Sequence, residues 1–164
     1  MEEHDPFNEP ETAHPRAQEL MTEPGLWDCS DEEAPFGSDE GFDAYYEFRH
    51  WRADNPDQPL TACFSWIMDG RLSEYNAALH DDASVTRDLA EPDDAFLAEH
   101  FDMFTLDATV MATALGQLLD EGTIDADAKP YVRVAVQRQL HKDIVTSEHR
   151  QKLLLAVQRV VDVA

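Results

Sequence analysis

The sequence is short of basic residues, of cysteine and of long apolar runs, and each shortage excludes a class of protein. Its 164 residues hold 12 Lys and Arg against 35 Asp and Glu, a formal net charge of −23. Nucleic acids and anionic membrane surfaces are bound through Lys and Arg, so neither direct nucleic-acid binding nor membrane binding is expected. Two cysteines, Cys29 and Cys63, are too few for a disulfide framework. No apolar run approaches the roughly 20 residues that span a bilayer.

The first ten residues are acidic and lack the basic and apolar regions of a signal peptide. Together with the low cysteine content, this predicts a cytoplasmic protein in a reducing environment. Hydrophobic residues make up 43% of the chain, which is too many for a wholly disordered protein. No cofactor is expected.

The charges that are present are sorted along the chain. Residues 1–128 hold 32 acidic against 5 basic residues, a net of −27, and residues 129–164 hold 3 against 7, a net of +4. Such a distribution favours a basic protein partner, or no partner at all. An alternative stays open, because only 3 of the 12 basic residues are Lys, and a Lys-poor, acidic surface is also typical of proteins from a salty or compositionally biased source.

Composition divides the chain into a tail and one domain. Residues 1–24 contain four prolines and seven acidic residues, with little periodic apolar content, and are predicted to be an extended or disordered acidic tail. Residues 25–164 are expected to form a single helical domain.

Apolar periodicity and capping residues predict an all-α fold of about six or seven helices. Ser38 or Asp39 can cap the first long helix, Gly122 can end the most regular one, and Thr146 or Ser147 can cap the last. Residues 132–136 alternate like a strand but lie within a helical window. Residues 80–94 are polar and predicted to be mostly loop, with one helical turn near 85–89. Helices are expected over about 40–53, 60–68, 72–79, 106–120, from Asp125 or Asp127 to 141, and 146–162, with a short one between Asp93 or Asp94 and Phe101.

No motif identifies a reaction, and no catalytic residue is predicted. None of the seven histidines has a second histidine at the i, i+4 spacing of a helical metal site. The acidic runs 28–33 and 39–43 do not follow the EF-hand order, which leaves open only a weak divalent site. Cys63 lies in an apolar segment, and the acids around Cys29 should raise the pKa of its thiol.

The residues between 28 and 52 are the candidate interaction face. Tyr, Trp and Arg dominate the energetically important positions of protein interfaces, and Arg49 and Arg52 are the only basic residues between Arg16 and Arg71. The competing interpretation, which we favour, is a core helix whose arginines pair with surrounding acids. The candidate face consists of Tyr45, Tyr46, Arg49, Trp51 and Arg52, with the acidic residues Asp28, Asp31, Glu32 and Glu33.

The segments 34–41, 59–61 and 66–67, which read APFGSDEG, PLT and WI, resemble a group of small acidic bacterial proteins of the YfeS-like kind. The resemblance implies a bacterial, cytosolic, compact domain and brings no catalytic residue.

Two hypotheses for the function follow from the composition. The first is a small interaction protein of inhibitor, immunity or regulatory type, whose acidic surface engages a basic protein partner. The alternative is a carboxylate- or metal-dependent enzyme of the hydrolase type, since the chain is rich in Asp and Glu and long enough to hold a cleft.

Overall fold

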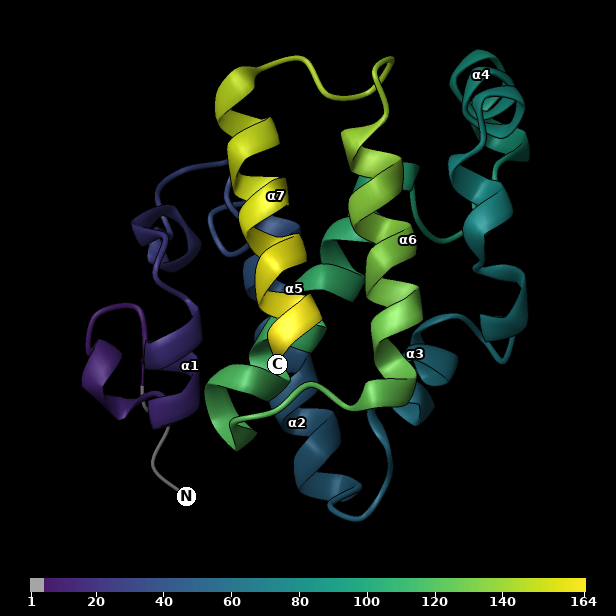
Figure 1. The fold of residues 1–164 in the computed structure, drawn as a ribbon. Helices are drawn as coiled ribbons and strands as arrows, with labels where there is room; N and C mark the ends of the chain where they lie inside the picture. The colour runs from purple at the N-terminus through teal and green to yellow at the C-terminus, as the bar shows by residue number, and fades with distance from the viewer. Residues whose placement is uncertain (1–4) are drawn as a thin grey trace.

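All regular structure in residues 5–164, the part of the chain that the computed structural model describes, is helical, which confirms the predicted all-α domain (Figure 1). No helix in this part is both long enough and apolar enough to cross a membrane. The described residues form seven α-helices: α1 (Pro15–Leu20), α2 (Asp39–Asp54), α3 (Leu60–Ile67), α4 (Asp82–Ala90), α5 (Met103–Glu121), α6 (Lys129–Leu140) and α7 (Glu148–Val163). The short 3-10 helices are η1 (Pro10–Thr12), η2 (Pro24–Trp27), η3 (Leu72–Glu74), η4 (Ala77–His80), η5 (Pro92–Asp94) and η6 (Ala126–Ala128).

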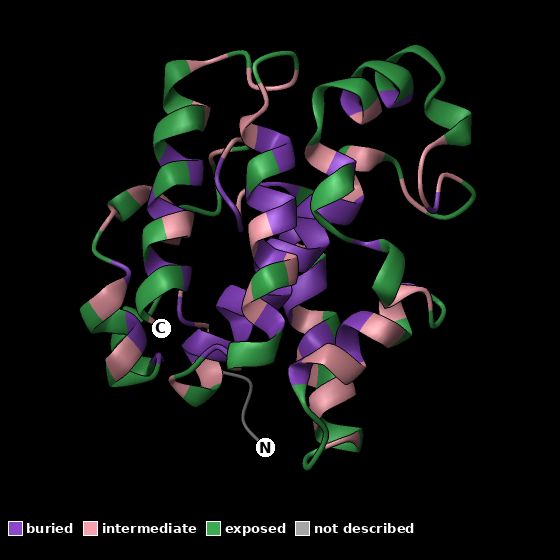
Figure 2. Cartoon of the chain, turned by 45° about the vertical axis from the view of Figure 1, so that its right-hand side comes forward, coloured by how far each residue is buried: buried purple, intermediate pink, exposed green. Residues whose placement is uncertain are grey.

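Helix α5 is the centre of the molecule. Its most extensive contacts are with α2 and α6, and α6 in turn packs against α7. Figure 1 shows α6 and α7 side by side in front of α5, with α2 behind it. Every residue from Leu106 to Leu119 is buried, as the continuous buried band in Figure 2 shows. A helix that is covered on all sides is the core of the fold rather than an amphipathic surface helix.

Three of the predicted helix ends are confirmed: the start of α2, the end of α5 and the start of α7. Ser38 Oγ accepts the Gly41 N–H at 3.1 Å at the start of α2, and Ser147 Oγ accepts the Arg150 N–H at 2.9 Å at the start of α7. Gly122 has a φ of 79° and ends α5 in the left-handed conformation that glycine adopts without strain. These residues satisfy backbone groups that the helix itself leaves unpaired.

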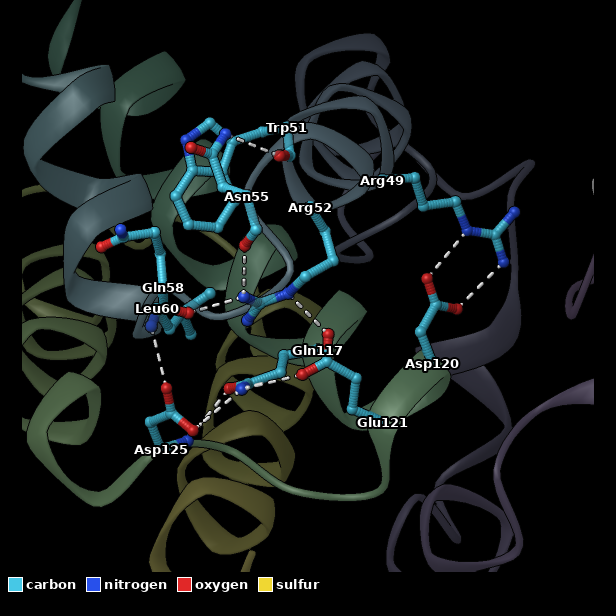
Figure 3. A network of polar contacts seen from close by, with 10 residues as sticks. All are labelled: Arg49, Trp51, Arg52, Asn55, Gln58, Leu60, Gln117, Asp120, Glu121 and Asp125. Atoms are coloured by element: carbon cyan, nitrogen blue, oxygen red, sulfur yellow. Dashed lines mark hydrogen bonds and ion pairs between the residues drawn. The ribbon is translucent and has the colours of Figure 1, made fainter. Parts of the chain in front are cut away.

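Asp125 does not cap α6 as predicted, because its carboxylate is used elsewhere (Figure 3). Its Oδ2 accepts the backbone N–H of Leu60, the first residue of α3, at 2.8 Å. Its Oδ1 accepts a hydrogen bond from Gln117 Nε2 of α5 at 2.9 Å, and the side-chain Oε1 of Gln117 accepts the Asp125 N–H at 3.0 Å. Asp125 therefore joins the start of α3 to the end of α5. Pro130 lies in the first turn of α6, where proline is tolerated.

Three predictions for residues 72–101 were wrong in detail. The expected helix over 72–79 is two short 3-10 helices, η3 and η4. Most of the expected loop over 80–94 is helix α4, which buries only Val85 and Asp88 and therefore has almost no apolar stripe. The expected helix between Asp94 and Phe101 is a series of turns, in which Leu97 has a positive φ of 58° that does not continue a helix.

The N-terminal segment also differs from its prediction as an extended or disordered tail. Residues 1–4 lie outside the described residues, but residues 5–24 fold onto the domain. Ala17 and Met21 are buried, and the Phe7 ring lies 4.8 Å from the Phe36 ring. The His14 N–H donates to the Leu119 carbonyl at 2.8 Å, near the end of α5. The prolines begin helices here instead of excluding them, since proline is tolerated at the first helical position.

Candidate functional site

Tyr45 and Arg49, from the aromatic half of the predicted interaction face, connect α2 to the end of α5. Tyr45 is fully buried, and its hydroxyl donates to Asp120 Oδ1 at 2.6 Å. Arg49 forms a two-pronged ion pair with the same carboxylate, with Nε to Oδ2 at 2.9 Å and Nη2 to Oδ1 at 3.0 Å (Figure 3). Burial and the adjacent carboxylate raise the pKa of Tyr45 well above its ordinary value, so the hydroxyl is a donor at neutral pH.

Arg52 is held in the same way. Its Nε donates to Glu121 at 2.8 Å, and its Nη1 donates to the backbone carbonyls of Asn55 and Gln58 at 3.1 and 2.6 Å. Trp51 and Tyr46 are half-buried and pack against the core. The arginines of the predicted face thus pair with acids of the fold, as the favoured interpretation required.

The acidic half of the predicted face contacts α7. Asp31 Oδ2 lies 2.5 Å from His149 Nε2, and the Glu33 carboxylate accepts the Ser147 hydroxyl at 3.0 Å. Asp28 instead closes a local turn, accepting the Ser30 N–H and hydroxyl. The exposed Glu32 lines a cleft described below. This loop is therefore placed against the basic end of the chain.

Neither cysteine is activated as a nucleophile. Burial raises the pKa of Cys63 to about 12. Partial desolvation of the Cys29 thiol, with the nearby Asp5 and Asp28 carboxylates, raises its pKa to about 11, in the direction that its acidic neighbours predict. Both thiols are protonated at neutral pH, and neither forms a disulfide within the described residues.

A buried ion pair lies in the core between α5 and α6. Arg138 donates to both oxygens of Asp107, with Nε to Oδ2 at 2.8 Å and Nη2 to Oδ1 at 2.7 Å. The Tyr75 hydroxyl and Gln139 Nε2 donate to the same carboxylate at 2.5 and 2.7 Å. All four side chains are buried, so the carboxylate has its acceptor capacity filled and is closed to a substrate. The cluster fixes helix positions.

The strongest candidate for a binding site is a cleft of about 420 Å³ between α2, α3 and α5, which we call the acidic groove. Its α2 wall carries Glu40, Asp43 and Glu47, which the i, i+3, i+7 spacing places on one face of the helix. Its other walls are apolar or hydroxylic. The acidic groove is lined by Glu40, Asp43, Ala44, Glu47, Trp66, Ile67, Phe101, Thr105 and Thr109.

Trp66 is the exposed aromatic residue of the acidic groove. The buried residues Cys63 and Phe64 fix which side of α3 faces the core, and this leaves Trp66 57% exposed at the end of the helix. It is the largest of the exposed apolar side chains in the described residues. An exposed tryptophan beside carboxylates is the surface that binds a cation through its ring face.

The carboxylates of the acidic groove are not neutralised by the fold. None of Glu40, Asp43 and Glu47 forms an ion pair with a described residue, and no Lys or Arg lines the groove. In contrast, Asp120, Glu121 and Asp107 all have arginine partners. The acidic groove thus offers three uncompensated negative charges next to an aromatic surface.

A second cleft, of about 370 Å³, lies where the acidic loop meets the start of α7. Arg150 is mostly buried there, and its Nη1 donates to the Glu33 carbonyl at 2.5 Å. Its Nη2 is buried and has no hydrogen-bond acceptor among the described residues. Burial lowers the pKa of this guanidinium. The lining mixes acidic with apolar residues: Glu32, Glu33, Leu89, Met103, Phe104, Gln139, Asp143, Ile144, Val145, Thr146 and Arg150.

Comparison with known proteins found no matching family model, no matching curated protein and no matching solved structure. The resemblance to YfeS-like proteins therefore stays a prediction.

Proposed function

We propose that the protein is a small interaction protein that binds a basic segment of a partner protein in the acidic groove. The observation that supports this most directly is the placement of three unpaired carboxylates, Glu40, Asp43 and Glu47, beside the exposed Trp66. Carboxylates attract and orient Lys or Arg side chains, and a tryptophan ring stabilises the same cations by a cation–π contact. The free cysteines support a reducing, cytoplasmic setting for this interaction.

The charge of the whole chain supports the same class of partner. A net charge of −23 raises the rate at which a cationic surface encounters the protein, and it repels nucleic acids. A uniformly distributed negative charge would attract a basic partner but would not fix where on the surface it binds. Trp66 and Ile67 add apolar contact area at one place, which is what a specific interface requires at its centre.

The test is the affinity for a synthetic lysine- and arginine-rich peptide, measured by calorimetry, with a glutamate-rich peptide as the negative control. Binding of the basic peptide should weaken as salt rises. Glu40→Gln, Asp43→Asn and Glu47→Gln in combination should weaken it at least about tenfold, or about 1.4 kcal/mol, and Trp66→Ala should do so without changing the net charge.

The matched control removes three charges elsewhere. Asp81, Asp93 and Asp94 are exposed residues at the ends of α4 and in η5, away from the lining of the acidic groove. Their combined replacement by Asn should lower the affinity much less than the groove variant does. Equal losses for the two triple variants, together with an unchanged affinity for Trp66→Ala, would show that diffuse charge alone binds the peptide and would refute a groove-specific site.

A further inference from the structure

Three side chains that can bind a metal meet at the start of α7. Asp31 and Glu33 come from the acidic loop and His149 from the first turn of α7, more than a hundred residues later in the sequence. Each offers one ligand atom, and the three atoms lie within 4.8 Å of one another. In the described part of the chain this is the only group of three or more such residues. We propose that Asp31, Glu33 and His149 bind a divalent transition-metal ion of the zinc class.

The distances suit a small tetrahedral ion. Zinc bonds of about 2.0–2.2 Å to nitrogen and oxygen place neighbouring ligand atoms about 3.4 Å apart. The Asp31 Oδ2 to His149 Nε2 distance is now 2.5 Å, so these atoms must separate by about one ångström. The Glu33 ligand oxygen lies within 4.8 Å of both atoms, so it needs to approach them by no more than about 1.4 Å. His149 is exposed and both carboxylates are only half-buried, so side-chain rotation can supply these shifts.

The surrounding residues orient the carboxylates. Asp31 Oδ1 accepts the Glu33 N–H at 3.0 Å, which leaves Oδ2 as the oxygen that faces His149. The Ser147 hydroxyl donates to the Glu33 carboxylate. Such hydrogen bonds to ligating carboxylates are the usual outer shell of a metal site.

The ligand types select the metal. A histidine nitrogen favours zinc and its neighbours over Mg²⁺ and Ca²⁺, which prefer oxygen ligands and need more of them. Two cations lie nearby: Lys152 is 3.7 Å from the Glu23 carboxylate, and Arg150 donates through Nη1 to the Glu33 carbonyl. The positive charges of Lys152 and Arg150 disfavour the binding of a cation. The three negative charges of Asp31, Glu33 and the neighbouring Glu32 outnumber them.

Three protein ligands leave a fourth position for an added ligand. Glu33 also lines the second cleft, so the proposed ion lies at the edge of a cavity large enough for a small molecule. Arg150 also lines this cleft, although its Nη2 atom is buried and its guanidinium carbon lies 5.5 Å from the Phe104 ring centroid.

The test is calorimetric titration of the chelator-treated protein with ZnCl2, in physiological salt with excess MgCl2 to suppress weak binding by other acids. The protein should bind about one zinc ion, and His149→Ala should weaken this binding at least about tenfold. Asp31→Asn should do the same, and near-UV circular dichroism of each variant shows whether it has folded. His149→Gln, which keeps the size of a polar side chain, serves if the alanine variant does not fold.

His100 provides the matched control. It is an exposed histidine whose Nε2 lies 2.9 Å from the Asp69 carboxylate, but it belongs to no group of three ligands. His100→Ala should leave zinc affinity unchanged within about twofold. Equal affinity for His149→Ala and the natural protein, no zinc binding at all, or binding of Ca²⁺ as tight as that of Zn²⁺ would overturn the proposal. The residues of the acidic groove are not involved, so this outcome is independent of the peptide experiment.

Discussion

Asp107 illustrates how one buried charge depends on its surroundings. Arg138, Tyr75 and Gln139 together donate four hydrogen bonds to its two oxygens. Removing a charge from water is costly, and the geometry here compensates for that cost only while every donor has its acceptor. The cluster therefore stabilises the fold only while all four hydrogen bonds to Asp107 are present.

Asp107→Asn should lower the free energy of unfolding by about 3–5 kcal/mol, because it leaves the Arg138 guanidinium buried without a counter-ion. Urea denaturation measures this. The control is Asp162→Asn, which breaks the exposed ion pair of Arg133 and Asp162 and should cost at most about 1 kcal/mol. A similar loss in both variants would contradict the role assigned to burial.

At the scale of the element, the contact between α2 and α5 depends on a residue with no side chain. A Cβ atom on Gly116 would lie 2.7 Å from Tyr45 Cδ1 and 3.3 Å from its Cε1. Tyr45 cannot move aside easily, because it is fully buried and its hydroxyl is held by Asp120. Gly116 therefore sets how closely the two helices approach.

Gly116→Ala should destabilise the protein by about 1–3 kcal/mol, since overpacking outweighs the better helix propensity of alanine. Thermal and urea unfolding measure the change. In a Tyr45→Ala background the same substitution should have little further cost, because the ring that it would contact is gone. Additive effects in the double variant would show that the cost arises elsewhere.

Local signals in the sequence predicted the elements that depend on local chemistry. Ser38, Ser147 and Gly122 fix the ends of three helices through their own hydrogen bonds or dihedral angle, so those bounds were correct to within a few residues. Helix α4 was missed because it buries only Val85 and Asp88 and so has almost no apolar stripe. Residues 5–24 were missed because their order comes from contacts with distant residues, such as Phe7 on Phe36, which no local pattern reveals.

The candidate sites were only partly predictable. The spacing of Glu40, Asp43 and Glu47 is visible in the sequence, but so many acids are present that it does not stand out. Trp66 becomes a surface residue only through the way that α3 packs. His149 reaches Asp31 through the tertiary fold, and only the acidic run containing Asp31 was recognised beforehand as a weak divalent site.

For the molecule as a whole, the basic C-terminal part acts as an internal counter-charge. Arg138 pairs with Asp107, Lys152 with Glu23, and Arg150 donates to the carbonyl of Glu33. These contacts join residues 129–164 to the acidic part of the chain. Twelve basic residues cannot balance 35 acidic ones, so a large surplus of repulsion remains.

The melting temperature should rise by a few degrees when ionic strength increases from about 0.01 to about 0.15 M, because the screening length falls from about 30 to about 8 Å. A gain of about 1 kcal/mol corresponds to about 2–4 °C for a domain of this size. Calorimetry with a chelator present, in NaCl and separately in KCl, isolates screening from the binding of a metal or a specific ion. A melting temperature that stays constant would mean that the acids are already locally compensated.

The burial of α5 from Leu106 to Leu119 has a consequence for how this protein can change over evolutionary time. A helix at the surface can vary on its outer side, and its relatives share only a stripe of similar residues. Between Leu106 and Leu119 no side is free to vary, since every residue is in contact with the rest of the molecule. Divergence should therefore be slow along an unbroken block here and fast in the acidic surface around it. A distant relative would be recognised by this one segment long after the rest of the sequence had lost its similarity.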